Sequence, residues 1–282
     1  MAKGWTIKEI LLWTTRYFQK KGIQEPRLEA EVLLARVLQK DRVYLYINYD
    51  SPVNPDELAI MHDFVARRAW GEPIAYITGS KEFMSLNFKV DPSVLIPRPD
   101  TEILVETAIN LLQARDNPRI CDVGTGSGAI AISLAYYLRD AMVYATEISE
   151  KALAIARENA AAHKVTVYFY QGSLLLPVMG EEKFDLITAN LPYITVDEYR
   201  ELDIEISRFE PETALVAGGD GLDLYRQLLP QAMDRLNTGG HLLLEIGSSQ
   251  AAKALEMASK YREVELIRDL SGHNRVVKIG KE

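Results

Sequence analysis

Apolar residues in the first 70 positions recur every three or four residues, which is the spacing of an amphipathic helix. Signals for a helix start precede each run. Thr6 with Glu9 makes a capping box, and Pro26 has the first-turn position that proline favours. Asn54-Pro55-Asp56-Glu57 repeats the start signal, and a glycine ends the run that follows it. The pattern predicts a small all-α domain over residues 1–73.

Residues 74–95 have a different pattern. Ile74–Thr78 combines β-branched and aromatic residues, Gly79-Ser80 is typical of a turn, and Phe83–Val90 largely alternates apolar and polar positions. We predict a β-hairpin linker between the helical domain and a second domain, residues 96–282.

Beyond this linker, strand and helix patterns alternate. The predicted strands are Arg119–Val123, Met142–Thr146, Val165–Tyr170, Phe184–Ala189, His241–Ile246, Glu263–Arg268 and Arg275–Ile279. The predicted helices, which accompany the first five strands, are Thr101–Leu112, Ala129–Leu138, Glu150–His163 and Leu222–Leu236. Only a short turn joins the last two strands, so they should pair antiparallel. The pattern predicts an α/β fold with a Rossmann-like, doubly wound and mostly parallel sheet.

Composition narrows the class of protein. Of 282 residues, 48% are apolar and 26% charged, which is typical of a folded globular chain. No apolar run approaches the ~20 residues that cross a bilayer, and Met1–Trp13 lacks the pattern of a signal peptide. The single cysteine, Cys121, excludes an intramolecular disulfide and is expected to be a buried core residue, and no pair of histidines has zinc-ligand spacing. We expect a cytoplasmic, metal-free protein with no membrane contact.

Charge is distributed unevenly. Residues 1–73 hold 11 Lys and Arg against 10 Asp and Glu, whereas the remainder holds 21 against 30, a net charge of −9. Proteins that bind nucleic acids normally present a basic face to the phosphates. The charge therefore argues against a nucleic-acid partner, without excluding one.

A glycine-rich loop follows the first predicted strand of the second domain. Gly124-Thr125-Gly126-Ser127-Gly128 lies between a strand and a helix, where free backbone N–H groups meet a ligand. Glu147 ends the next strand, at the position of an acidic residue that holds ribose hydroxyls. NAD and S-adenosylmethionine both contain such a ribose, so the loop alone does not choose between them.

Asn190-Leu191-Pro192-Tyr193 follows another buried strand. An Asn oxygen and the Leu191 carbonyl can accept the two hydrogens of a planar, conjugated –NH2 group, and Tyr193 can stack on it. Ligands bind at the carboxyl ends of strands in such sheets. Together with the glycine loop, this turn indicates a site that recognises a planar, conjugated –NH2 group beside a bound ribose-containing ligand.

These motifs resemble S-adenosylmethionine-dependent methyltransferases with an Asn-Pro-Pro-Tyr-type turn. They resemble more closely the peptide chain release factor glutamine methyltransferases, the PrmC/HemK family. The likeness covers nearly the whole chain through Gly71–Gly79, Leu95–Glu102, Asp122–Gly128, Asn190–Tyr193 and Arg208–Leu215. Its most specific string is Ile-Pro-Arg-Pro-Asp-Thr-Glu, which ends at Glu102.

The resemblance implies a class I methyltransferase fold, S-adenosylmethionine as methyl donor and S-adenosylhomocysteine as product. It implies N5-methylation of the glutamine in the Gly-Gly-Gln motif of class I release factors, with residues 1–73 docking that substrate. The implied cofactor-binding residues are Gly124, Thr125, Gly126, Ser127, Gly128, Glu147, Leu174 and Asn190, with Ser173 also near the adenine. The implied catalytic and substrate-binding residues are Asn190, Leu191, Pro192 and Tyr193, with Arg98 shaping the substrate pocket.

The chain departs from the family pattern at two positions. Leu191 stands where the family usually has proline, and Ser173 stands where many relatives have an acidic residue. Because Pro192 restricts residue 191 to an extended conformation, we expect residue 191 to contribute only its carbonyl. The expected mechanism is direct transfer to the positioned amide nitrogen without a strong general base.

Three alternatives stay open: an N6-adenine DNA or RNA methyltransferase, an NAD-dependent dehydrogenase and an inactive binding module on the same scaffold. Arg208 and Glu210, in a long loop after Tyr193, either close over the substrate or form a surface ion pair. We expect a monomer. The docking geometry and the modification of other glutamines are left open by the sequence.

Overall fold

The computed structural model describes residues 4–261 and 263–282, so residues 1–3 of the predicted helical domain and residue 262 lie outside the described residues. The chain divides into two compact units. The first contains Met1–Gly79 and Ile204–Phe209, and the second contains Ser80–Asp203 and Glu210–Glu282. The chain therefore passes between the two units three times.

The first unit consists of helices around an apolar core. Its helices are α1 (Ile7–Lys20), α2 (Pro26–Leu38), α3 (Arg42–Ile47), α4 (Pro55–Ala69), α5 (Ile74–Thr78) and α10 (Ile204–Phe209). Thr6 and Asn54 cap α1 and α4 with the predicted capping boxes, and Pro26 is the first residue of α2, so these helix starts are confirmed. The sequence pattern misses α3 because it has six residues, of which Leu45 alone is buried.

Ile74–Thr78 is a helix, so the predicted strand there is wrong. Pro73 directly precedes α5, the Thr78 hydroxyl donates to the Ile74 carbonyl at 2.9 Å, and Gly79 ends the helix with a left-handed φ of 71°. Four of its five residues are buried. A short run that is buried on nearly every side has no period, so its β-branched composition indicated a strand.

The α10 segment belongs to the first unit through two contacts. Arg68, which is 9% exposed at its side chain, pairs with Glu29 on α2 at 2.6 Å and with Glu205 on α10 at 2.9 Å. The Arg208 guanidinium lies 4.0 Å from the centre of the Trp70 ring. A buried arginine and a cation–π contact therefore attach α10 to the helical unit. The α10 segment follows Gly79 by more than a hundred residues.

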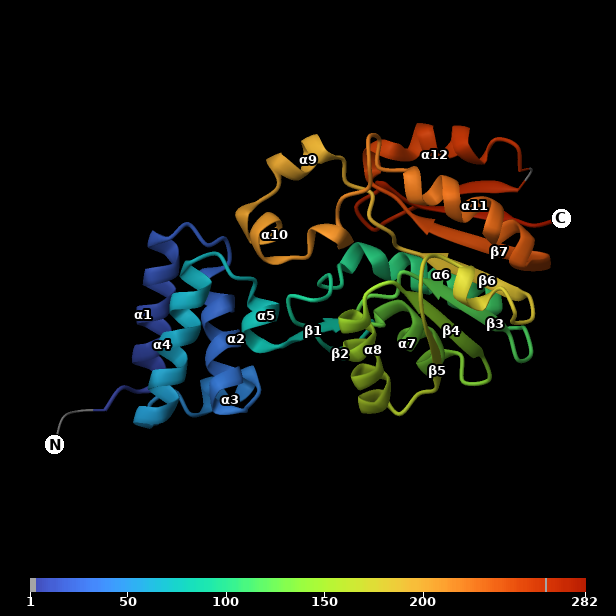
Figure 1. Ribbon diagram of the computed structural model, residues 1–282. Helices are drawn as coiled ribbons and strands as arrows, with labels where there is room; N and C mark the ends of the chain where they lie inside the picture. The colour runs from blue at the N-terminus through green and yellow to red at the C-terminus, as the bar shows by residue number, and fades with distance from the viewer. Residues whose placement is uncertain (1–3, 262) are drawn as a thin grey trace. The chain divides into compact units, whose positions relative to one another are not determined.

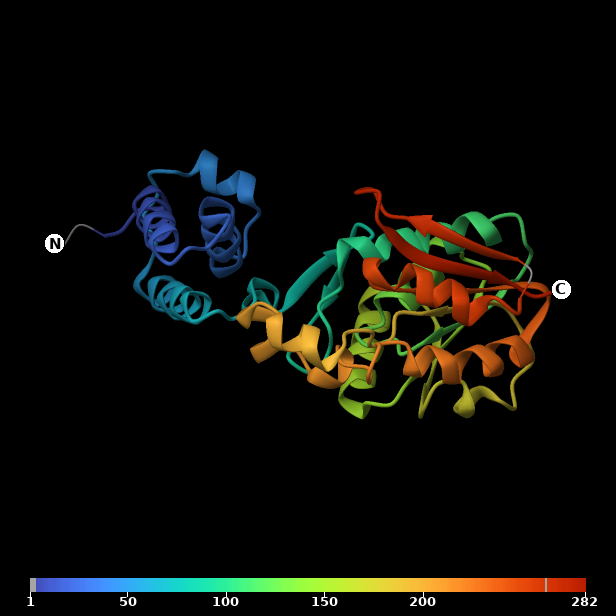
Figure 2. The ribbon, with the colours of Figure 1, turned by 90° about the horizontal axis from the view of Figure 1, so that it is seen from above.

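The second unit contains a seven-stranded sheet with the order β5-β4-β3-β6-β7-β9-β8 (Figures 1 and 2). The strands are β3 (Arg119–Val123), β4 (Met142–Glu147), β5 (Val167–Gln171), β6 (Phe184–Ala189), β7 (Leu236–Glu245), β8 (Val264–Arg268) and β9 (Asn274–Gly280). The first five are parallel, and β9 pairs antiparallel with both β7 and β8. The predicted fold class is confirmed, with β7 starting at Leu236 rather than His241.

Helices cover both faces of this sheet (Figure 1). One face packs against α6 (Glu102–Leu112), α7 (Ala129–Tyr137) and α8 (Glu150–His163), and the other against α11 (Asp223–Arg235) and α12 (Ala251–Ala258). Strand residues alternate between the two apolar clusters, so each strand is buried on both sides. The sequence pattern missed α12, which has eight residues, and α9 (Val196–Glu201). Within the described ranges, no helix is long and apolar enough to cross a membrane.

A hairpin of β1 (Ser80–Phe83) and β2 (Leu86–Lys89) opens the second unit. Met84 and Ser85 form its two-residue turn with positive φ angles of 50° and 58°, as hairpin turns of this length require.

The buried Asn159 of α8 connects this hairpin to the loop after β3. Its Oδ1 accepts the Lys89 N–H at 2.7 Å, and its Nδ2 donates to the carbonyls of Lys89 at 3.0 Å and Ser127 at 2.9 Å. One amide side chain therefore satisfies backbone groups from two segments that are distant in sequence.

We expect Asn159→Ala to lower the free energy of unfolding by about 2–3 kcal/mol, because it leaves buried backbone groups without partners. The exposed Asn110 on α6 offers a matched control, and Asn110→Ala should change stability by less than about 0.5 kcal/mol. Urea unfolding of both variants measures the difference. Equal midpoints for the two variants would contradict the prediction.

Candidate active site

A cavity of about 390 Å³ lies at the carboxyl edge of the parallel strands. The order of the strands in the sheet reverses between the neighbouring strands β3 and β6. Doubly wound sheets bind ligands at the point of this reversal. Most of the predicted site residues line the cavity: Arg98, Gly124, Thr125, Gly126, Ser127, Glu147, Leu174, Asn190, Leu191 and Pro192. In the described part of the chain, Gly128 and Tyr193 lie outside this lining.

The three glycines of the loop after β3 have two different structural roles. All have positive φ: 72° at Gly124, 54° at Gly126 and 83° at Gly128. A Cβ at Gly124 would lie 2.6 Å from a methyl of Leu191, and one at Gly128 would lie 2.6 Å from Ile132. A Cβ at Gly126 would have no atom within 4 Å. The outer glycines permit close packing, whereas Gly126 exposes bare backbone to the cavity.

Glu147 lies beside this bare backbone. Its carboxylate accepts the Gly126 N–H at 3.0 Å and the Ser149 N–H at 2.9 Å. A carboxylate has about four lone-pair positions, so acceptor positions remain for the hydroxyls of a ribose. Glu147 thus both holds the glycine loop and can bind a sugar.

A second carboxyl, Asp122 at the end of β3, was not predicted as a site residue. Burial raises its pKa to about 6, although the Thr188 hydroxyl donates to its Oδ1 at 2.8 Å. The hydroxyl of Thr125, which is also buried under the glycine loop, lies close enough to lower the pKa of Asp122, but by less than burial raises it. The signal in the sequence was an acidic residue inside an apolar strand.

The far end of the cavity is apolar. Ser173 and Leu174 line it, and Leu174 has an unusual left-handed φ of 49°. The exposed side chain of Ile148, which also lines the cavity, follows Glu147 directly. A flat base fits between such side chains. The sequence analysis did not identify Ile148, although it directly follows Glu147.

Thr101 orients Asn190. The Asn190 Nδ2 donates to the Thr101 hydroxyl at 3.2 Å, so the amide group has its nitrogen toward α6 and its oxygen left to accept a hydrogen. Thr101 is buried and lines the same cavity. The sequence did not reveal this contact, because Thr101 and Asn190 are 89 positions apart.

Leu191 contributes more than its carbonyl, so the expectation that residue 191 supplies only that group is wrong. Its peptide N–H donates to the hydroxyl of Tyr225 at 3.1 Å. Its buried side chain packs in the space that the missing Cβ of Gly124 leaves. The departure from proline at this position therefore changes the local hydrogen bonds.

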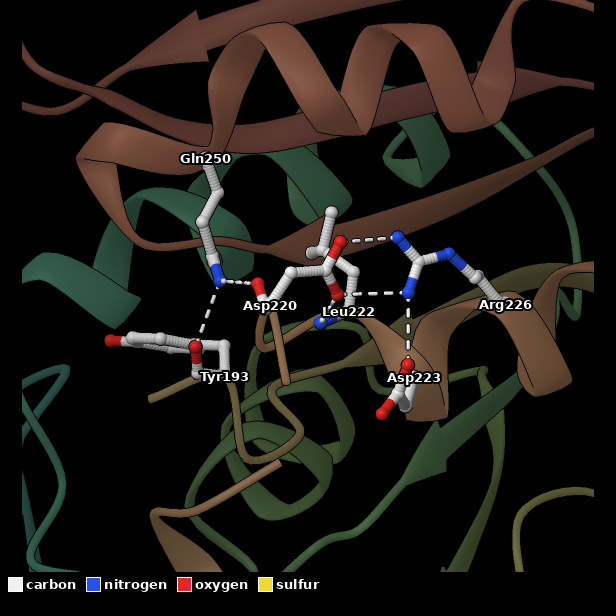
Figure 3. Close-up of polar contacts among 6 residues, drawn as sticks. All are labelled: Tyr193, Asp220, Leu222, Asp223, Arg226 and Gln250. Carbon is white, nitrogen blue, oxygen red and sulfur yellow. Dashed lines mark hydrogen bonds and ion pairs between the residues drawn. The ribbon is translucent and has the colours of Figure 1, made fainter. Parts of the chain in front are cut away.

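The backbone after Leu191 is held from outside the cavity (Figure 3). The Gln250 Nε2 donates to the Tyr193 carbonyl at 2.8 Å and to the Asp220 carbonyl at 3.1 Å. A Cβ at Gly221 would lie 2.0 Å from the Tyr193 carbonyl oxygen, so this approach requires glycine. The Asp220 carboxylate in turn pairs with Arg226. In this network, Tyr193 contributes its carbonyl.

Arg98 and Glu210 form an ion pair in which the glutamate is 1% exposed and the arginine 34%. Glu210 also accepts the Ile96 N–H at 3.1 Å. Arg208 instead stacks on Trp70 in the first unit. The surface ion pair between Arg208 and Glu210 that the sequence suggested is therefore wrong. Glu210 fixes an arginine that reaches the cavity.

Glu245, the last residue of β7, is a buried carboxyl beside β6. Burial raises its pKa to about 7, and the nearby hydroxyls of Thr101 and Tyr193 and the Arg275 guanidinium lower it by less. In the described part of the chain, its Oε2 makes no hydrogen bond of good geometry. Arg275 pairs with Asp100 at 2.8 Å.

The sheet order, with the glycine loop and Glu147 at the carboxyl edge of its strands, is that of a class I methyltransferase. A family model for the methyltransferase small domain matches residues 99–206, and a model for the PrmC N-terminal domain matches residues 9–79. Among solved structures, the catalytic domain of hMettl16 in complex with a MAT2A 3′UTR hairpin has a TM-score of 0.58. It is 16% identical and covers 78% of this chain and 82% of its own. A methyltransferase from Pyrococcus furiosus has a TM-score of 0.52 at 22% identity, covering 76% of this chain and 95% of its own.

Two relatives show to which family of class I methyltransferases the chain belongs. A release factor glutamine methyltransferase of Geobacter sulfurreducens is 45% identical over 97% of this chain and 96% of its own length. One from Moorella thermoacetica is 43% identical over 96% of each. The chain belongs to the release factor glutamine methyltransferase family.

The methyl donor of this fold is S-adenosylmethionine, and the residues present fit it. Gly126 presents backbone without a side chain, Glu147 has free acceptor positions, and Ile148 with Leu174 offers apolar surface for a base. The cavity volume also lies within the range of about 300–1,000 Å³ for small-molecule sites.

We expect Glu147→Ala to weaken S-adenosylmethionine binding at least about tenfold, because a charged acceptor for two hydroxyls is lost. Glu147→Asp should weaken it less. Glu150→Ala, at the exposed next carboxyl, serves as a control that should leave affinity unchanged. Calorimetric affinities of the three variants test this, and wild-type affinity in Glu147→Ala would remove Glu147 from the site.

The raised pKa of Glu245 predicts how the free energy of unfolding depends on pH. Because its folded pKa of about 7 exceeds the usual 4.5, the folded state binds more protons between these values. The stability that the protonated Glu245 carboxyl contributes is therefore fully present below pH 4.5 and is lost as the pH rises through 7. Between pH 5 and 8, the stability of Glu245→Gln relative to wild type should rise by about 2 kcal/mol.

Urea unfolding at several pH values measures this change. Glu106→Gln, at an exposed carboxyl of α6, should show no such trend. A constant difference between wild type and Glu245→Gln would show that Glu245 does not titrate in this range.

Proposed function

We propose that this protein transfers a methyl group to the side-chain amide nitrogen of the glutamine in the Gly-Gly-Gln motif of class I release factors. One observation carries the proposal: the Asn190 amide nitrogen donates to the Thr101 hydroxyl, which leaves the Asn190 oxygen as an acceptor, and Asn190 and Leu191 line the same cavity. Two acceptors at one cavity suit the two hydrogens of a primary amide. The names of the relatives support this substrate.

S-adenosylmethionine would supply an electrophilic methyl group on its sulfonium. Glu147 and the Gly126 backbone would hold the cofactor, with Leu174 against the base. Asn190 and Leu191 would accept the two amide hydrogens and orient the nitrogen lone pair. The methyl replaces one of these hydrogens, which leaves as a proton to solvent. An N-alkylated amide cation is strongly acidic, so no strong general base is required.

Pro192 and Arg98 would shape the substrate side of the cavity. The buried Glu210 fixes Arg98 by an ion pair, which lowers the cost of ordering its long side chain. Tyr193 is half-buried, and burial raises its pKa to about 12. We assign it to support of the turn through its carbonyl, and stacking on the amide remains a prediction.

The helical unit would dock the body of the release factor. Trp5, which precedes α1, forms a continuous aromatic row with Trp13 and Tyr17 on α1, with ring centres 6.4 and 5.3 Å apart. Trp5 and Trp13 are 45% and 46% exposed. Exposed aromatic residues are enriched at protein interfaces, whereas the unit is nearly neutral and offers no concentration of positive charge for phosphates. We propose a monomeric, cytoplasmic enzyme.

Adenine is the alternative acceptor, since its amino group is also planar. The second domain's net charge of −9 beyond residue 73 disfavours the phosphates that flank a flipped base. Family membership likewise favours glutamine.

We expect methylation of an intact release factor at the Gly-Gly-Gln glutamine, weaker methylation of a short peptide with this motif and none of DNA. Asn190→Ala should lower the single-turnover rate about 10²- to 10³-fold, with a smaller effect on cofactor affinity, because a preorganised acceptor is lost. Mass spectrometry locates the methyl group, and the exposed Asn110→Ala is the control. A methyl on adenine with an untouched glutamine would overturn the assignment.

A further inference from the structure

The hydroxyl of Tyr225 joins the ends of β6 and β7 beyond their last paired residues. The pairing of these strands ends at Ala189 with Leu244. One residue further, the strands would separate. There the Tyr225 hydroxyl accepts the Leu191 N–H at 3.1 Å and contacts two carbonyl oxygens, that of Glu245 and that of Leu191, the latter at 3.3 Å.

The number of hydrogens limits what this hydroxyl can do. It has one hydrogen to donate and two lone pairs with which to accept. If its hydrogen goes to the Glu245 carbonyl, a lone pair accepts the Leu191 N–H, and the Leu191 oxygen keeps both lone pairs for another donor. Tyr225 is fully buried, and burial raises its pKa well above 10, so it keeps this hydrogen.

Leucine at position 191 is part of this arrangement. A proline would have no N–H to donate to Tyr225. The Leu191 side chain also fixes the peptide from its other end, because it fills the space beside Gly124. The peptide is therefore held at its nitrogen by α11 and at its side chain by the glycine loop, and in this arrangement its oxygen keeps both lone pairs.

We propose that Tyr225 is a positioning residue: through the Leu191 N–H, it sets the direction of the carbonyl that accepts a hydrogen of the glutamine amide. This inference rests on the proposed role of that carbonyl. Tyr225 does not touch the substrate. It acts by holding two strand ends in register past the end of their ladder, as a backbone hydrogen bond would.

The test combines Tyr225→Phe, Leu191→Pro and the double variant. Each single change removes the N–H···O contact, so each should lower the single-turnover rate of methyl transfer about tenfold or more, since small misplacements of reacting groups are costly. The double variant should be about as slow as the slower single variant, because the two changes remove one interaction. Affinity for S-adenosylmethionine should stay within about twofold of wild type, and so should the KM of the release factor, whereas kcat falls.

Two controls separate positioning from general stability. Leu191→Ala keeps the N–H and removes the packing, so adding Tyr225→Phe to it should still lower the rate tenfold. Tyr144→Phe removes a hydroxyl from another buried tyrosine of the same core and should leave kcat unchanged. If Leu191→Pro does not fold, replacing the Leu191 peptide nitrogen by an ester oxygen removes the same hydrogen.

Three outcomes would overturn the inference: a wild-type rate in Tyr225→Phe, equal slowing by Tyr225→Phe in the wild-type and Leu191→Pro backgrounds, or a loss of thermal stability without a fall in kcat. A wild-type protein that does not methylate the release factor would instead refute the proposed function. The two failures are therefore distinguishable.

Discussion

The pairing of β3 with β6 is the constraint on which the site depends. These strands lie 60 residues apart in sequence, and their register ends with Val123 opposite Ala189. The next residues, Gly124 and Asn190, begin the glycine loop and the proposed acceptor turn, Asn190–Tyr193. The loop glycine has no Cβ, so Leu191 can pack against it at a distance that any side chain would block. The glycine loop and the proposed acceptor turn thus share one edge of the sheet and line one cavity.

Two buried carboxyls lie near this edge of the sheet, and burial raises the pKa of both. Asp122 lies under the glycine loop with a pKa raised to about 6, and Glu245 lies beside the acceptor turn with a pKa raised to about 7. Each is costly to bury when ionised, because few partners offset the loss of hydration. Such costs are typical of functional sites, where polar groups are held ready for a ligand rather than for the fold.

The acceptor turn is also part of a longer connection. After Tyr193 the chain forms α9 in the second unit, and then contributes α10 to the helical unit before it returns at Glu210. Arg68 and Trp70 hold α10, so residues 1–73 are not an independent module. Removing them would leave the partners of α10 missing, which is why variants of single residues are the sharper tests of substrate docking.

Local signals in the sequence were sufficient for much of this protein. Capping residues, periodic apolar positions and the glycine loop each act within a few residues, and they indicated helix starts, the alternation of strands and helices along the chain, and several of the residues that line the cavity. The same signals failed where no period exists, at Ile74–Thr78 and in the short helices α3 and α12. Only the tertiary structure decided which partners hold the acceptor turn. Thr101, Tyr225 and Gln250 reach it from distant elements, and a hydrogen bond across such separations depends on strand register and helix packing, which no local pattern specifies.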